Sequence, residues 1–131
     1  MTMTQDEQLA KCLRYSEMTM NPVLTPTLLD PIAETLELTE TELGRLFRVS
    51  RQAVGQWRER GVPSDRMAKV ATVAAICDLL HHRLKPERIP GIARRPADAY
   101  GGLSMLEMIE RDREDELQAE IRRSFDWAAS V

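Results

Sequence analysis

The amino-acid sequence predicts an all-α fold, and three observations support this expectation. From residue 27 onward, apolar residues recur at intervals of three and four, which is the period of a helix with one buried face. Residues that start and end helices bound each of these runs. Aromatic residues make up only 5% of the 131-residue chain, which disfavours an aromatic-rich β-sandwich, and no segment alternates as a strand does. The hydrophobic share of 43% is sufficient for one modest core.

The first segment, residues 1–26, has weak periodicity, and Pro22 and Pro26 would end any helix within it. We therefore interpret it as a mobile or loosely docked arm. The next segment predicts a helix that ends near Leu36. Pro31 lies in its first turn, where a backbone N–H has no helical partner.

Two short helices are predicted next. Thr39 and Glu42 have the spacing of a capping box, and Ser50 is placed to cap a second helix over residues 51–60. Only a few residues remain for the turn, so the segment has the helix-turn-helix pattern, with Gly44 small where the two helices cross closely. The side chains expected to face inward are Leu43, Leu46, Phe47, Ala53, Val54 and Trp57.

A long helix is predicted from residue 64 or 65 to about residue 84. Pro86 and Pro90 then break the chain into a basic, irregular connector. The apolar face expected for the long helix consists of Met67, Val70, Ala71, Ala74, Cys77, Leu80 and Leu84.

The C-terminal part of the chain predicts a turn followed by two more helices. The pair Gly101–Gly102 marks the turn, and Ser104 with Glu107 forms a second capping box. Asp112 is expected to cap the last helix, and residues 125–131 are expected to form an aromatic tail.

Charge is segregated along the chain, although the formal net charge is only −3. Residues 48–69 contain six bases and two acids, residues 81–95 contain five bases and one acid, and the two ends of the chain are acidic. Two basic segments on an acidic chain indicate an anionic partner for the middle of the protein.

The sequence favours a cytoplasmic protein. It has no run of 18 apolar residues that could cross a membrane, and residues 1–10 lack the basic-then-apolar pattern of a signal peptide. Cys12 and Cys77 are too few for a disulfide framework. No enzymatic motif is present, and the acidic segment 110–116 is interpreted as a solvated helix face. Neither an enzyme nor a cofactor is therefore expected.

A metal site is not expected either. Cys77, His81 and His82 lie at helical spacing, but two or three ligands on one helix do not close a coordination shell.

The second short helix carries the candidate DNA-reading residues. Arginine suits guanine O6 and N7, and glutamine suits adenine N6 and N7. The alternative is a solvated helix face that does not touch DNA. The outward face consists of Arg51, Gln52, Gly55, Gln56 and Glu59, and the candidate phosphate contacts are Arg48, Arg58, Arg60, Arg66 and Lys69.

The stretch from Glu40 to Trp57 resembles the helix-turn-helix of lambda-repressor-like (Xre) regulators. That family often has glycine in the turn, where this chain has Arg48. Because a left-handed arginine costs about 1 kcal/mol relative to glycine, a differently shaped turn is expected.

Residues 86–131 look like the toxin-binding module of the Xre/MbcA/ParS antitoxins. The shared elements are Arg94-Arg95-Pro96 and the stretch from Tyr100 to Ile109, with Met105 where the family commonly has proline. The two resemblances imply a helix-turn-helix domain over residues 27–84 and a small helical toxin-binding module over residues 85–131.

The resemblance also implies a partner, a RES-domain toxin that destroys NAD⁺. In such pairs the C-terminal part of the antitoxin covers the active-site cleft of the toxin. The alternative is that the two terminal aromatic residues pack on the protein's own core. The candidate toxin-binding residues are Arg94, Arg95, Tyr100, Arg122, Arg123, Phe125 and Trp127.

The sequence therefore predicts the antitoxin of a type II toxin–antitoxin pair, which binds its toxin and represses its own operon by binding operator DNA. A homodimer within a larger toxin–antitoxin complex is expected, because palindromic operators demand two-fold symmetry. Two alternatives stay open, a stand-alone transcriptional regulator without a toxin and an adaptor that no longer binds DNA. Candidate interface or core positions are Val70, Val73, Cys77 and Leu80.

Overall fold

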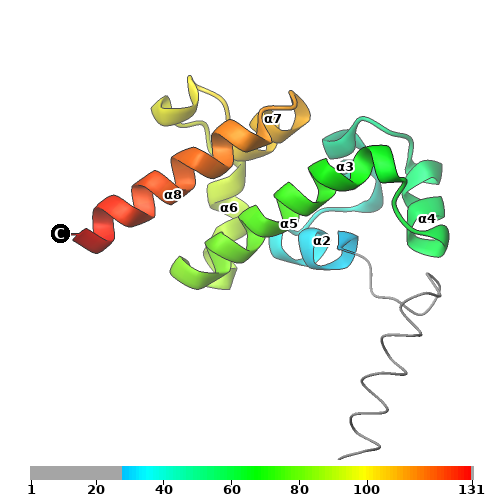
Figure 1. Ribbon diagram of the computed structural model, residues 1–131, viewed down its shortest axis with the longest axis horizontal. Helices are drawn as coiled ribbons and strands as arrows, with labels where there is room; N and C mark the ends of the chain where they lie inside the picture. The colour runs from blue at the N-terminus through cyan, green and yellow to red at the C-terminus, as the bar shows by residue number, and fades with distance from the viewer. Residues whose placement is uncertain (1–27, 131) are drawn as a thin grey trace, which may run out of the picture.

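The computed structural model describes the backbone of residues 28–130 and the side chains of residues 28–126, and every regular element in this range is helical (Figure 1). The predicted all-α class is confirmed. The predicted arm, residues 1–26, lies outside the described residues. The elements in chain order are α2 (Leu29–Leu36), α3 (Glu40–Phe47), α4 (Arg51–Arg60), α5 (Ser64–Arg83), η1 (Pro86–Arg88), α6 (Ile89–Arg94), η2 (Asp98–Tyr100), α7 (Met105–Glu110) and α8 (Glu114–Ser130).

Local capping sets the starts of α3 and α4, as the sequence predicts. The Thr39 hydroxyl accepts a hydrogen bond from the backbone N–H of Glu42, whose carboxylate accepts one from the Thr39 N–H in return. The Ser50 hydroxyl accepts from the Ala53 N–H at 3.0 Å. These bonds satisfy N–H groups that have no partner within the helix.

The turn between α3 and α4 corrects one expectation and refines another. Arg48 adopts the left-handed conformation that glycine would take, with φ 59° and ψ 44°, so the expected difference in turn shape is wrong. Gly44 is required by the turn rather than by a helix crossing. A Cβ atom at this position would lie 2.7 Å from the carbonyl oxygen of Val49. This contact is too close for any side chain, so only glycine fits here.

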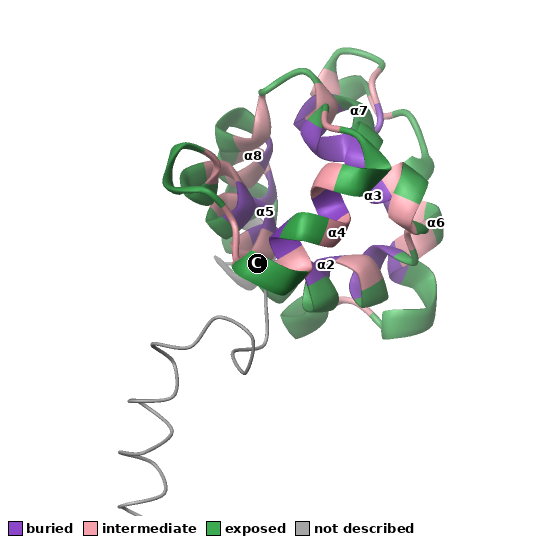
Figure 2. Ribbon diagram, turned by 90° about the vertical axis from the view of Figure 1, so that its right-hand side faces the viewer, coloured by how far each residue is buried: buried purple, intermediate pink, exposed green. Residues whose placement is uncertain are grey.

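The central helix of the fold is α5, which packs against both α2 and α8 (Figure 1). In addition, α7 contacts α3, and α6 contacts α2. The predicted N-terminal domain, residues 27–84, and the predicted C-terminal module, residues 85–131, therefore contribute to one hydrophobic core. Figure 2 shows the buried residues on the inward faces of the helices, with exposed residues around the outside.

The predicted apolar face of α5 is correct only in part. Met67 is 41% exposed and Ala71 is exposed, whereas Val73 and Ile76 are buried. A helix with partners on two sides buries more than one stripe, and a single-stripe pattern cannot describe it. The four positions considered for an interface or the core all belong to the core of a single chain: Val70, Val73, Cys77 and Leu80.

The connector after α5 is more regular than the sequence indicated. Residues expected to be irregular form η1 and α6, and Ile89 and Ala93 on α6 are fully buried. Pro90 lies in the first turn of α6, where its missing N–H costs no helical hydrogen bond. A proline interpreted as a helix breaker thus lies at a helix start.

The C-terminal helices confirm one predicted cap and correct another. The capping box of Ser104 and Glu107 is present, and both glycines of the preceding turn have positive φ. Asp112 does not cap α8. It is left-handed, with φ 61°, and the carbonyl of Arg113 instead accepts the first hydrogen bond, from the N–H of Leu117.

The expected aromatic tail is also wrong as a separate element, because α8 continues through Ser130.

None of the helices in the described part of the chain is both long and apolar enough to cross a membrane.

Candidate nucleic-acid interface and partner surface

The outward face of α4 is the best-formed candidate site. Val54 is fully buried and Trp57 is 6% exposed, with the Trp57 ring centroid 6.0 Å from that of Phe47. These contacts fix the rotation of α4 about its axis, so the opposite side is presented to solvent. Arg51 and its neighbours on that side make no ion pair or hydrogen bond to another side chain among the described residues. The exposed set is Arg51, Gln52, Gln56, Glu59 and Arg60.

Two further features favour close approach of an anionic groove to α4. A Cβ atom on Gly55 would meet nothing within 4 Å, so the middle of the face is open. The first turn of α4 contains no acidic residue. The partial positive charge at this helix N-terminus is therefore not offset within the turn.

The basic residues around α4 are less available than the sequence indicated. Arg58 is 28% exposed and donates hydrogen bonds to Glu40, at 2.8 Å for the shortest, and to Asp30. The hydrogen bond with Glu40 is the main reason that the pKa of Arg58 is raised. A DNA phosphate would have to displace two carboxylates to reach this guanidinium.

Arg48 and Lys69 share one carboxylate. Asp112 Oδ2 lies 3.0 Å from the Arg48 guanidinium, and Asp112 Oδ1 lies 2.5 Å from Lys69 Nζ. Lys69 also lies 3.8 Å from Glu114, and Arg66 donates to the carbonyl oxygen of Phe47. The hydrogen bond from Lys69, followed by the charges of Lys69 and Arg48, lowers the pKa of Asp112.

These contacts correct the interpretation of segment 110–116 as a purely solvated face. Sequence reasoning missed the four carboxylates that pair with the basic segment, Asp30, Glu40, Asp112 and Glu114. Asp112 and Arg48 are 64 positions apart, so no local spacing could reveal their pairing.

Two of the candidate toxin-binding residues are adjacent in sequence but differ in their contacts. Arg94 donates to the carbonyl oxygens of Leu36, Glu37 and Pro90, each at 2.9 Å, and so completes the C-terminal end of α2. Arg95 is exposed. Arg94 therefore has a structural role that its position in the motif did not indicate.

The remaining candidates lie on η2 and α8. Tyr100 is half-buried, and burial is the main reason that its pKa is raised. Phe125 is half-buried against the core, with the Arg83 guanidinium 5.3 Å from its ring centroid. Arg122 and Arg123 are both exposed, and Arg123 pairs with Glu120 on the same helix. The packing of Phe125 favours the alternative in which it docks on its own chain. The side chain of Trp127 lies outside the described residues.

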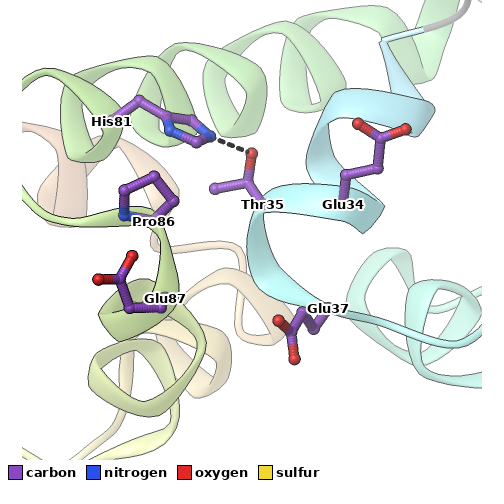
Figure 3. Close-up of a pocket in the computed structure, with 6 residues that line it drawn as sticks. All are labelled: Glu34, Thr35, Glu37, His81, Pro86 and Glu87. Carbon is purple, nitrogen blue, oxygen red and sulfur yellow. Dashed lines mark hydrogen bonds between the residues drawn. The ribbon is translucent and has the colours of Figure 1, made fainter.

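A separate pocket of about 380 Å³ lies between α2, α5 and η1 (Figure 3). His81 Nε2 and the Thr35 hydroxyl are 2.9 Å apart in it, so His81 is engaged with α2. Across residues 28–126, no three histidine, cysteine or acidic side chains are grouped so that they could hold a metal ion. The buried Cys77 thiol has its pKa raised to about 12 by burial, so it is protonated at neutral pH.

Comparison with family models found no match for this chain, and the comparisons with curated proteins and with solved structures found none either.

Proposed function

We propose that this protein binds double-stranded DNA through α4 and represses transcription as the antitoxin of a type II toxin–antitoxin pair. The observation that carries the DNA-binding part is the outward face of α4. Arg51, Gln52 and Gln56 are exposed together on a helix that Val54 and Trp57 hold firmly against the core.

In this proposal α3, the turn and α4 form a helix-turn-helix, and α4 enters the major groove with its N-terminal end first. Arg51 then binds a guanine edge, and Gln52 or Gln56 binds an adenine edge. The open space at Gly55 lets the bases approach the helix backbone. Arg60 is exposed at the end of α4 and is the candidate for a phosphate contact. Unlike Arg58, it has no carboxylate partner in the described structure that a phosphate would first have to displace.

The partner in this proposal is a RES-domain toxin. The resemblance of residues 86–131 to the antitoxin module supports this assignment, and the exposed Arg95 and Arg122 are available for binding. The C-terminal end of α8 lies at the opposite end of the molecule from α4 (Figure 1). This separation would allow DNA and the toxin to be bound at the same time, by a homodimer on a two-fold operator.

The DNA-binding part is tested by titrating a duplex of the gene's own promoter at low salt with the wild type and with Gln56→Ala. The expected loss is about 1–3 kcal/mol of binding free energy on the cognate sequence. Gln118→Ala, a glutamine change on the half-buried flank of α8, is the matched control and should bind as the wild type does. Equal affinities for all three proteins would reject α4 as the reading helix.

The toxin-binding part is tested by co-expression with the RES-domain enzyme, with NAD⁺ content as the readout. Arg95→Ala combined with Arg122→Ala is expected to weaken neutralisation while DNA binding persists. DNA binding without any effect on such an enzyme would favour the stand-alone regulator.

A further inference from the structure

The corner between α7 and α8 places a carboxylate beside the N-terminal end of α4. Asp112 in this corner contacts Arg48, which precedes the first residue of α4 by only three positions. Arg48 and Asp112 are both non-glycine residues with positive φ, 59° and 61°, a conformation that is uncommon for them. Two separate turns therefore hold the two charged side chains against each other.

We propose that Asp112 is an intramolecular competitor for DNA phosphate at Arg48 and Lys69, so that the α7–α8 corner limits the affinity of α4 for DNA. This inference rests on the proposed DNA binding and adds a regulator of that same site. A carboxylate and a phosphate each present oxygen acceptors to a cation, so they compete for the same donors.

The surroundings of Asp112 would allow its carboxylate to be replaced by a phosphate. Three cations act on it, since Lys69, Arg48 and Arg66 all lower its pKa. A cleft of about 550 Å³ opens at this junction and is lined by Asp112 and the three cations, and also by the acidic residues Asp65 and Glu114. The cleft leaves room beside the carboxylate for an incoming phosphate group.

Exposure of the partners indicates which contacts can exchange. The side chains of Asp112 and Arg48 are 56% and 61% exposed, and exposed ion pairs of this kind contribute little to stability. Lys69 and Glu114 are each 13% exposed, and Glu114 Oε1 is buried without a hydrogen-bond partner. Lys69 thus keeps a buried acidic neighbour while its outer partner, Asp112, is the one that phosphate can replace.

The experiment compares DNA binding by the wild type, Asp112→Asn and Asp112→Gly over a range of salt concentrations, with a mixed-sequence duplex as the probe. Asparagine and glycine both accept a left-handed backbone, so neither change strains the corner. The matched control is Asp78→Asn, which removes the same charge from an aspartate that is 75% exposed on the second half of α5.

Both Asp112 variants are expected to bind about tenfold more tightly than the wild type at low salt. Their plots of log K against log salt should be steeper by about one to two, because each additional cation that neutralises a phosphate contributes about 0.9. Asp78→Asn should change neither quantity appreciably.

Unchanged affinity and slope in both Asp112 variants, with the wild type binding DNA, would overturn the competitor role and leave the proposed function standing. No DNA binding by any of the four proteins at low salt would overturn the proposed function, and the competitor role with it. Thermal melting of each variant confirms that the compared proteins are folded.

Discussion

Two surfaces carry residues that the sequence suggested for partner binding. They are the outward face of α4 and the C-terminal surface formed by α6, η2 and α8, and they differ in how many intramolecular contacts these residues make. On α4, the exposed Arg51, Gln52 and Gln56 have no side-chain partner within the described part of the chain. On the C-terminal surface, Arg94 completes the end of α2 and Phe125 packs beneath Arg83. Residue type suggests a candidate for binding, and its internal contacts decide whether it is available.

Removing the anchor of α4 should have the largest effect. Trp57→Ala deletes a side chain that is 6% exposed and packs against Phe47, so a loss of about 3–5 kcal/mol in unfolding free energy is expected. Denaturant titration measures it. A loss below 1 kcal/mol would mean that α4 is not held by this contact, and its exposed face would then lose its fixed orientation.

Removing a free residue should separate binding from stability. Arg51→Ala should cost about 1–3 kcal/mol in binding to the cognate operator and leave the melting temperature nearly unchanged, because Arg51 has no internal partner in the described structure. Arg122→Ala, an exposed arginine on α8, serves as the control with full DNA affinity. A large drop in melting temperature for Arg51→Ala would show that Arg51 stabilises the fold, which contradicts its assignment as a side chain without an internal partner.

The neighbouring arginines at the start of the C-terminal motif offer a sharper contrast. Arg94→Ala should lower the unfolding free energy by about 1–2 kcal/mol, because three carbonyl oxygens lose a charged donor. Arg95→Ala should change it by no more than about 0.5 kcal/mol. Chemical denaturation of the two variants side by side checks this, and equal losses would remove the distinction between them.

The smallest effect expected is the pH dependence that Asp112 contributes. Its pKa is lowered in the folded protein, chiefly by the hydrogen bond from Lys69. The stabilisation is therefore complete above the ordinary aspartate pKa of about 3.9 and is lost as the pH falls through the lowered folded value. Because the side chain is 56% exposed, the contribution should stay below about 1 kcal/mol.

The difference in stability between the wild type and Asp112→Asn, followed by thermal melting from pH 7 downward, should shrink only in this acidic window. A difference that disappears already near pH 6 would point to another titrating group.

Local signals in the sequence predicted much of the fold. The capping boxes at Thr39 and Ser104 and the cap at Ser50 involve residues three positions apart, and all three are present. Pro90 misled the prediction because proline is compatible with a helix start as well as with a helix end. Periodicity alone could not distinguish the two.

The sequence pattern could not predict the ion pairs between residues that are far apart in the chain. The basic segment around α4 was correctly identified, but its neutralisation by Asp30 and Asp112 depends on how α2 and the α7–α8 corner pack against it. The left-handed Arg48 has a local origin instead. It is the C-cap of α3, and its backbone N–H donates to the carbonyl oxygens of Arg45 and Gly44, in a conformation that is uncommon for arginine.

Footprinting the gene's own promoter with the wild type and with Arg51→Ala shows whether α4 reads DNA. If it does, the wild type protects a discrete, two-fold symmetric site at low salt, and Arg51→Ala loses this protection while remaining folded. No protection by the wild type at low salt, or identical footprints for the two proteins, would contradict DNA reading by α4.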